Sequence, residues 1–353
     1  MEKVRFDDFI KLNRGFDLPD AYIEEGPYPV VASTNIKAYH KDYKIDGPAV
    51  TTGRSGSLGK VQYVEGRCWP LNTSLYVKDF KGNNPRYVYY FLQTMHLEQY
   101  NAGAGVPTLN QNHLHSLKLL IHKKNEQARI ASILSAYDKL IENNNKRIRI
   151  LEKMAENLYK EWFVRFRFPW HENVLMENGL PKGWYQERLS SVLEIRYGKD
   201  HKNIDNGDIP VYGSGGIMRY GNKALHSGCS VLIPRKGSLN NILYVEGDFW
   251  TVDTMFYSVP KIPNIARYIY FVLTEIDMVS LNTGAALPSM TTDILNRMKI
   301  IIPDSDILYK FESIVRWQYK QTDALKSQNA NLARQRNLLL PRLMSGKLSI
   351  NVD

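Results

Sequence analysis

The sequence lacks several features that would place it in a familiar class. Its 353 residues include only two cysteines, Cys68 and Cys229, and no CxxC pair, so we expect free buried thiols rather than a metal or redox site. No apolar run approaches the roughly 20 residues of a membrane span, so no membrane association is expected. The first residues lack the apolar core of a signal peptide, which predicts a cytoplasmic protein.

Catalytic signatures are also missing. A carboxylate-based nuclease needs an acidic pair followed by Glu-x-Lys, and no Glu-x-Lys occurs in the chain. The Asp/Asn-Pro-Pro-Tyr/Phe tetrapeptide of amino-methyltransferases is absent as well. The glycine-rich segment 53–59 matches neither a P-loop nor a dinucleotide-binding fingerprint. The sequence therefore predicts a binding protein with no catalytic residues.

The chain does contain a long internal repeat. Residues 28–121 recur without a gap at 209–302, so adding 181 to a residue number gives its counterpart. The segment Tyr-Val-Glu-Gly, for example, occurs at 63–66 and again at 244–247. A fixed offset of this length indicates two copies of one module rather than a short-period solenoid. Such a chain can present two similar surfaces to a partner that has two halves.

The repeat argues against a metal site. Three of the histidines lie close together in the sequence, at His113, His115 and His122. Their counterparts in the second copy are Ile294, Asn296 and Pro303. Because no histidine recurs, we expect no metal ligands in this chain.

Each copy begins with a globular part of mixed α and β structure, at residues 1–124 and 184–303. Short runs rich in β-branched residues predict strands in both copies, at 49–52, 61–64, 230–233 and 242–245. Residues 86–95 and 267–275 predict short amphipathic helices. The expected fold class is therefore α+β, with two tandem mixed domains.

A long helix follows each globular part, at residues 125–168 and 304–346. Apolar side chains recur in alternating steps of four and three, which is the heptad period of a coiled-coil seam. The first seam comprises Ile130, Leu134, Tyr137, Ile141, Asn144, Ile148, Leu151, Ala155, Leu158 and Trp162. The second is more polar and comprises Phe311, Val315, Gln318, Thr322, Leu325, Asn329, Leu332, Arg336, Leu339 and Leu343. We expect Asn125 to cap the start of the first helix and Asp304 or Ser305 to cap the start of the second. Pro169 should stop the first helix, and Gly346 should end the second.

The two helices are expected to pack antiparallel with internal twofold symmetry. Each spans on the order of 60 Å, whereas the connector, residues 169–183, reaches about 50 Å even when fully extended. The second globular part should therefore lie near the far end of the first helix, giving a dumbbell that ends in a short tail, residues 347–353. If paired seam numbers sum to 473, Asn144 faces Asn329, and a buried asparagine pair would fix this register.

Charge and loop composition favour a polyanionic partner. Lys plus Arg exceeds Asp plus Glu by 46 to 36, a formal charge of +10. Both copies keep a tight turn with a basic residue and a hydroxyl, at 54–58 and 235–239, which suits contacts to phosphates or base edges. The alternative is a hairpin with a structural arginine. The candidate contact residues, from these turns and two further loops, are Arg54, Ser55, Ser57, Lys60, Asn35, Thr108, Asn110, Arg235, Lys236, Ser238, Asn240, Ser214 and Ser289.

These parts together resemble the specificity subunit of type I restriction–modification enzymes over essentially the whole chain. The resemblance rests on tandem domains with an Arg-x-Gly-Ser-Leu turn and a Gly-Ala-x-x-Pro loop, each followed by a long helix. Residues 127–138 and 338–348 are also similar to the family's two shared helical regions. Residues 180–184, Leu-Pro-Lys-Gly-Trp, are a typical entry to a family domain, whereas residues 1–5 have no such lead-in.

The resemblance implies a non-catalytic subunit in which each target-recognition domain reads one half of a bipartite double-stranded DNA sequence. The helices would set the spacer and dock two adenine methyltransferase subunits that carry S-adenosylmethionine. Restriction subunits that translocate DNA with ATP and Mg would complete the complex. No cofactor is expected in this chain itself. Two alternatives stay open: a scaffold that clamps two partners without reading DNA, and a self-contained restriction–methylation enzyme.

Overall fold

The computed structural model describes residues 1–281 and 289–348. The chain divides into two units, of which unit 1 comprises residues 1–145 and 325–353, and unit 2 comprises residues 146–324. Each unit contains one globular domain and parts of two long helices. Unit 1 has the start of the first helix and the end of the second, and unit 2 has the end of the first and the start of the second. We call the globular parts domain 1, residues 1–123, and domain 2, residues 165–304.

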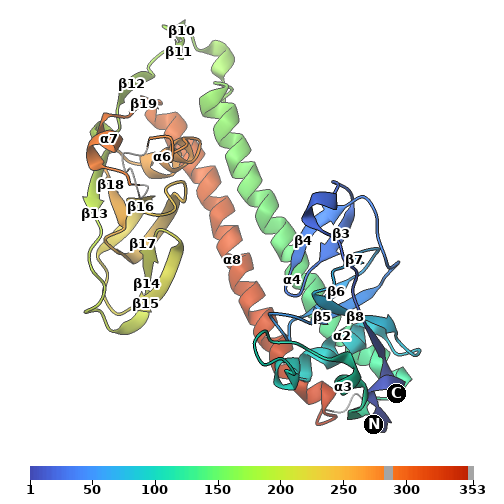
Figure 1. Ribbon diagram of the computed structural model, residues 1–353. Coiled ribbons are helices and arrows are strands. Elements are labelled where there is room, and N and C mark those ends of the chain that lie inside the picture. The colour runs from blue at the N-terminus through green and yellow to red at the C-terminus, as the bar shows by residue number, and fades with distance from the viewer. Residues whose placement is uncertain (282–288, 349–353) are drawn as a thin grey trace. The chain divides into compact units, whose positions relative to one another are not determined.

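Domain 1 contains three small sheets (Figure 1). A four-stranded antiparallel sheet has the order β2-β8-β5-β6, a three-stranded sheet has the order β4-β3-β7, and β1 pairs with β9. The strands are β1 (Glu2–Arg5), β2 (Lys11–Arg14), β3 (Tyr28–Val31), β4 (Ile36–His40), β5 (Ala49–Gly53), β6 (Val61–Val64), β7 (Trp69–Pro70), β8 (Ser74–Asp79) and β9 (Lys118–Ile121). The helices are α1 (Phe6–Phe9), η1 (Asp20–Tyr22), α2 (Pro85–Thr94), η2 (Leu97–Tyr100) and α3 (Gln111–His115).

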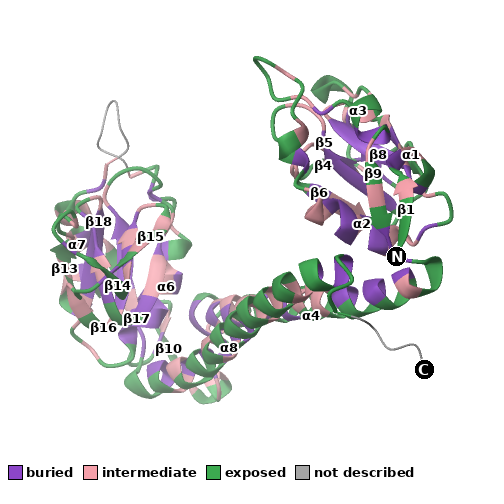
Figure 2. Ribbon diagram, turned by 90° about the horizontal axis from the view of Figure 1, so that it is seen from below, coloured by how far each residue is buried: buried purple, intermediate pink, exposed green. Residues whose placement is uncertain are grey.

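The core of domain 1 lies between its main sheet and α2 (Figure 2). All five residues of β5 are buried, as expected for a strand flanked on both sides. Helix α2 starts where the Asn84 side chain accepts a hydrogen bond from the Tyr87 N–H at 3.0 Å, with proline at its first position. Its buried aromatic side chains, Tyr87, Tyr90 and Phe91, pack on the sheet.

Domain 2 repeats this plan with a larger sheet. Six strands have the order β13-β18-β16-β17-β14-β15, and β12 pairs with β19. The strands are β10 (Met176–Glu177), β11 (Leu180–Pro181), β12 (Tyr185–Arg188), β13 (Leu193–Tyr197), β14 (Asn206–Gly213), β15 (Gly216–Gly221), β16 (His226–Pro234), β17 (Leu243–Thr251), β18 (Met255–Pro260) and β19 (Lys299–Ile302). The helices are η4 (His171–Asn173), α5 (Leu189–Val192), α6 (Ile265–Thr274) and α7 (Thr292–Arg297). The mixed α+β class predicted from the sequence is confirmed.

The repeat begins earlier than the ungapped match in the sequence. In domain 1, Glu2 pairs with Ile121, and in domain 2, Tyr185 pairs with Ile302. The two strand pairs close the domains in the same way, although residues 1–5 lack the lead-in that precedes domain 2. Antiparallel pairing uses backbone groups, so it needs no matching side chains.

The two long helices are α4 (Lys124–Tyr159) and α8 (Ser305–Met344), green and orange-red in Figure 1. In unit 1, the start of α4 and the end of α8 share one core, which includes Leu134 and Leu343. In unit 2, the end of α4 and the start of α8 share the other core, which includes Ala155 and Val315. The predicted antiparallel arrangement is therefore confirmed, and the helix ends belong to the domain cores.

The predicted seam positions are buried or half-buried at all twenty residues. In unit 1, Asn144 donates from Nδ2 to Asn329 Oδ1 at 2.9 Å, and also to Gln328 Oε1 at 2.9 Å. In unit 2, the Trp162 and Phe311 rings lie 6.2 Å apart between centroids. Within each unit, these pairs have numbers that sum to 473, as in the expected register.

The ends of the first helix differ from expectation. Pro169 does not stop it, because the α-helix ends at Tyr159 and a π-helical turn, η3 (Lys160–Val164), follows. This wider turn allows the neighbouring Trp162 and Phe163 both to be buried in the core of unit 2. Asn125 lies inside the first turn rather than before it, and its Oδ1 accepts from the Glu126 N–H at 2.9 Å, while the Lys123 N–H donates to Glu126 Oε2 at 3.0 Å. At the start of α8, Asp304 Oδ1 accepts from the Asp306 N–H at 2.8 Å.

The two cysteines lie in different environments. Cys68 is fully buried, and burial raises the pKa of its thiol to about 12. Cys229 is only half-buried, so the expectation of two buried thiols is wrong for this residue, because it lines an open cavity of unit 2, between domain 2 and α8. Within residues 1–281 and 289–348, no helix combines the length and the hydropathy that crossing a membrane requires.

Candidate nucleic-acid interface

The arginine-bearing turn is held in the same way in both domains. In domain 1, the Arg54 N–H donates to Thr73 O at 2.8 Å, and in domain 2, the Arg235 N–H donates to Thr254 O at 2.8 Å. The turn glycine has a φ of +81° in domain 1, at Gly56, and +83° in domain 2, at its counterpart. Since only glycine adopts this conformation without strain, both copies retain it.

The arginine side chains are also anchored identically. Arg54 Nη1 donates to Asn72 O at 3.2 Å, and Arg235 Nη1 donates to Asp253 O at 3.1 Å. These two carbonyl groups are counterparts at the offset of 181. A guanidinium has five N–H donors, so one anchoring bond orients the group and leaves donors for a ligand. The structural role considered as an alternative is therefore present, and it is compatible with contact to a phosphate or base.

A second loop is joined to this turn. The Leu109 N–H donates to Arg54 O at 2.8 Å, and the equivalent bond in domain 2 runs from Met290 to Arg235 at 2.9 Å. Ladder bridges also link Ser55 to Thr108 and Lys236 to Ser289. Residues 284–288 of the second Gly-Ala loop lie outside the described residues. In both domains, two of the three predicted loops therefore form one edge.

The third loop, at the tip of the β3–β4 or β14–β15 hairpin, lies beside the turn. A side chain on Gly237 would come within 2.8 Å of Ser214 Oγ, and Asn241 Nδ2 donates to Ser214 O at 2.8 Å. In domain 1, Gln62 Nε2 donates to Ala32 O at 2.7 Å. All three predicted loops therefore come together in each domain, and we call this the three-loop edge: residues 32–35, 54–60 and 103–110 in domain 1, with 213–216, 235–241 and 289–291 in domain 2.

Further candidate side chains on this edge have structural partners besides the two arginines. Asn110 accepts from the Asn112 N–H at 2.9 Å and caps α3, and Thr291 caps α7 in the same way. The lack of an amide counterpart to Asn110 therefore reflects an exchange of capping residues. Asn240 Nδ2 donates to Asp277 Oδ1 at 3.0 Å, and Thr108 Oγ1 donates to Val106 O at 3.0 Å. The exposed candidates are Asn35, Ser57, Lys60, Asn110, Lys236, Ser238 and Asn240, so Asn110 and Asn240 are exposed in spite of their structural partners.

The histidines of domain 1 have structural partners too. His115 Nε2 accepts from the Leu12 N–H at 3.0 Å, and His122 Nδ1 lies 3.0 Å from the Tyr87 hydroxyl. Burial lowers the pKa of both imidazoles. Among the described residues, no group of three or more His, Cys, Asp or Glu side chains is arranged to hold a metal ion.

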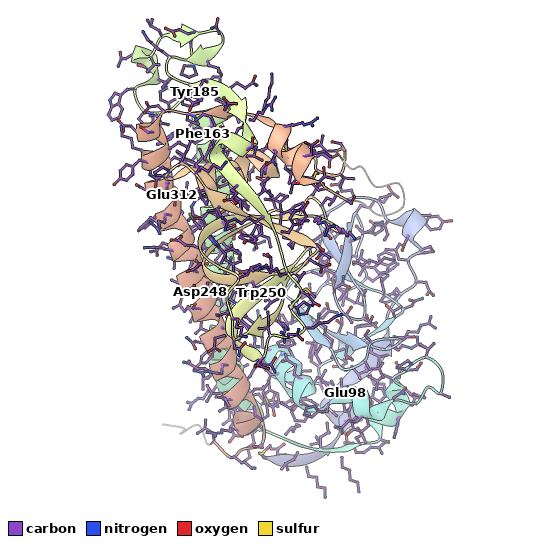
Figure 3. All side chains as sticks on the ribbon, turned by 90° about the vertical axis from the view of Figure 1, so that its left-hand side faces the viewer. Glu98, Phe163, Tyr185, Asp248, Trp250 and Glu312 are labelled. Atoms are coloured by element: carbon purple, nitrogen blue, oxygen red, sulfur yellow. The ribbon has the colours of Figure 1, made fainter. Side chains whose placement is uncertain are left out.

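A charged network that the sequence analysis missed joins domain 2 to its helix. Arg267 is only 2% exposed, and its Nε lies 3.1 Å from Glu312 Oε2. Glu312 lies on α8 and is labelled in Figure 3. Its guanidinium also lies 3.9 Å from the centre of the Tyr244 ring and 3.5 Å from Glu246 Oε2. Burial raises the pKa of Glu312, and Arg267 opposes that shift.

Domain 1 contains the counterpart of this network. Arg86 lies 4.0 Å from the Tyr63 ring and donates to Glu65 Oε1 at 3.2 Å. The contact to the helix is made differently, because Asp138 of α4 accepts from the Tyr90 hydroxyl and from Arg336. The repeated Tyr-Val-Glu-Gly segment, together with an arginine at the start of each short helix, was the signal for the shared part.

Comparisons with known proteins agree with this architecture. Residues 1–153 and 181–335 match the family described as "Type I restriction modification DNA specificity domain". The chain is 28% identical over 298 residues to the type I restriction enzyme MjaIX specificity subunit of Methanocaldococcus jannaschii, covering 75% of this chain and 69% of that protein. It is 30% identical over 131 residues to the EcoprrI specificity subunit of Escherichia coli, covering 37% of this chain and 33% of that one.

The fold has a solved counterpart. The S subunit of a type I restriction–modification system from M. genitalium superposes with a TM-score of 0.68 at 19% identity, covering 99% of this chain and 96% of that one. With two matched family segments that span both domains and most of both helices, this chain belongs to the type I restriction–modification DNA specificity family.

Proposed function

We propose that this chain reads a bipartite DNA sequence, with one half-site contacted by the three-loop edge of each domain. The observation that carries the proposal is the shared frame of the two edges. Arg54 and Arg235 are anchored to equivalent carbonyl groups, while the side chains around them differ. Two readers with one frame and different contact residues are what two different half-sites require. The formal charge of +10 supports a DNA partner.

The basic residues proposed to contact DNA on each edge form two groups, exposed lysines and half-buried arginines. Lys60 and Lys236 are exposed cations that suit phosphates, whereas the oriented Arg54 and Arg235 suit either a phosphate or a guanine. The hydroxyls of Ser57 and Ser238 add short-range donors and acceptors. This division assigns affinity to the lysines, and it assigns sequence preference to the arginines where they contact a guanine.

The antiparallel helices serve as a spacer and a docking surface in this proposal. Their mutual register within each unit, which includes Asn144 and Asn329, gives a defined rather than a sliding length. Apolar side chains also lie exposed on the outer faces of the helices. They include Ile133, Leu140, Ile150 and Met154 on α4, and Ile314, Trp317 and Leu338 on α8. Exposed apolar side chains in such numbers favour a protein partner.

We infer that these partners are two adenine methyltransferase subunits carrying S-adenosylmethionine, joined for cleavage by restriction subunits that use ATP and Mg. The chain itself would contribute no catalytic residue and bind no cofactor. Adenine methylation requires the base to leave the helical stack, and a reader bound on both sides of the spacer would hold the duplex in place for that step. A cytoplasmic location follows from this role, since the DNA and the partner subunits are there.

Methylome sequencing tests the proposal directly. Cells that express this chain with its cognate methyltransferase should acquire methylated adenines in one bipartite motif with a fixed spacer. A single continuous motif, or no change in methylation when this chain is removed, would contradict the two-reader function. Methylation by the purified chain with S-adenosylmethionine alone would instead favour a self-contained enzyme.

A further inference from the structure

The hairpin that ends in the third loop has an irregularity that recurs in both domains. In domain 1, Val31 pairs with Ile36 and Val30 with Ala38, so one extra residue bulges from β4. In domain 2, the same bulge separates the pairs formed by Ile217 and by Arg219 on β15. Bulges commonly re-aim a neighbouring side chain at a functional site. The bulge recurs at the offset of 181, next to Ile36 in domain 1 and Ile217 in domain 2. This recurrence indicates that the direction in which the isoleucine side chain points is important for function.

Both isoleucines face solvent. Ile36 is 42% exposed and Ile217 is 50% exposed, and a tyrosine three residues later, Tyr39 or Tyr220, is exposed to a similar degree. Leaving an isoleucine in water forfeits about 1 kcal/mol or more of burial free energy at each site. Neighbouring positions of the hairpins differ, as Lys37 is replaced by Met218. The exposed apolar pair is therefore retained in a segment that has otherwise diverged.

The surroundings of these isoleucines identify the partner as nucleic acid. Each lies on the hairpin whose tip approaches the arginine turn. In domain 1, a side chain on Gly53, next to Arg54, would come within 3.2 Å of Ser33 Cβ, and in domain 2, Asn241 Nδ2 donates to Ser214 O. The neighbours are thus hydroxyls and cations, a rim that suits phosphates. An apolar side chain inside a basic rim matches proteins that insert a wedge between base pairs. A β-branched side chain has little rotamer freedom to lose in doing so.

Resting on the proposed function, we propose that Ile36 and Ile217 are wedge residues that enter the base stack of their half-sites and open one base step. The exposed tyrosine on the same strand provides a flat face for an unstacked base. Part of the sequence preference of each domain then comes from how easily that step unstacks. This contribution adds to the contacts made by the arginine turn.

The test compares paired and pre-unstacked DNA. The full complex, with its methyltransferase subunits, is titrated with three duplexes that carry the methylated motif: one fully paired, and two with a single mismatch in one or the other half-site. A mismatch supplies the unstacking in advance, so a wedge becomes less necessary. The variants are Ile36→Ala and Ile217→Ala. Leu175→Ala is the matched control, since Leu175 is equally apolar, is exposed and lies in the connector.

We expect each isoleucine variant to bind the fully paired duplex on the order of tenfold more weakly, and a mismatch in its own half-site to restore most of that loss. The two variants should be rescued by different mismatches, and Leu175→Ala should bind like wild type. If the wild type prefers its motif but both variants bind unchanged, or lose affinity equally on all three duplexes, the wedge proposal is overturned and the proposed function is not. Equal binding of the wild type to motif and scrambled DNA would overturn the proposed function as well.

Discussion

Asn144 and Asn329 are joined by a hydrogen bond of 2.9 Å at half-buried to buried positions of the helix seam in unit 1. An asparagine at such a position costs stability but excludes registers in which it would face an apolar side chain. The pair therefore defines how far α4 and α8 overlap within this unit.

A double-mutant cycle measures this pair. Asn144→Leu alone should lower the free energy of unfolding by about 1–3 kcal/mol, because Asn329 and Gln328 lose a partner. The double variant, with Asn329→Leu, should recover most of that loss, since two apolar residues then meet. Urea unfolding of the four proteins gives the coupling energy. A coupling energy near zero would mean that the bond has no role in setting the register.

The buried ion pair between Arg267 and Glu312 predicts a larger effect. Glu312→Ala removes the carboxylate nearest to a buried guanidinium and leaves it beside the half-exposed Glu246 and two tyrosine rings. The free energy of unfolding of unit 2 should therefore fall by about 3 kcal/mol. The control is Glu172→Ala, which removes an exposed carboxylate from the same unit. Denaturant unfolding, followed by tryptophan fluorescence, distinguishes the two. A loss no larger than that of the control would show that the network adds no stability.

Features of the fold and the candidate site were predictable where they follow from spacing along the sequence, and not where they depend on contacts between distant segments. The offset of 181 predicted the two domains, the short connector predicted the antiparallel helices, and the heptad steps predicted the contact of Asn144 with Asn329. Each of these follows from spacing along the sequence. The Arg267–Glu312 pair was not predictable, since it depends on how α6 packs on α8. The π-helical turn was missed for the same reason, as it accommodates Trp162 and Phe163 in a tertiary core. The capping role of Asn110 at the start of α3 was not predictable either, because a capping asparagine and one that is only exposed look alike in a sequence.

Replacing Arg235 tests whether its side chain contacts a base or a phosphate of the DNA. Arg235→Ala should weaken binding to the cognate half-site by about 1–3 kcal/mol if the side chain reads a base. Binding to unrelated DNA should then change little. Arg188→Ala, which removes an exposed arginine from β12, serves as the control. Equal weakening on every DNA sequence, together with a smaller salt dependence, would assign Arg235 to a phosphate instead.

Acid should destabilise unit 1 before its carboxylates titrate. Burial holds the pKa of His115 and His122 below the ordinary 6.5, so the unfolded chain binds more protons in this range. Their contribution to stability is complete above pH 6.5 and is lost as the pH falls through the lowered pKa values. The free energy of unfolding should therefore fall as the pH drops below 6.5. Replacing both residues with glutamine should flatten that slope, and an unchanged slope would contradict the assignment.

If the helices act as a ruler, their length should set the number of base pairs between the two DNA half-sites. Removing one heptad from each helix shortens it by about 10 Å at 1.5 Å per residue. Since base pairs are spaced 3.4 Å apart, the preferred spacer should shorten by about three base pairs. Methylome sequencing of the shortened protein reads the new spacer. The same spacer with the same half-sites would refute the role of the helices as a ruler.

The most direct test of the central claim is a domain exchange read out by methylome sequencing. Residues 209–302 are replaced by residues 28–121, which match them without a gap. If each domain reads its own half-site, the methylated motif should become two inverted copies of the half-site read by domain 1, with the spacer unchanged. Retention of the original asymmetric motif would show that the domains do not read DNA independently, and would contradict the account.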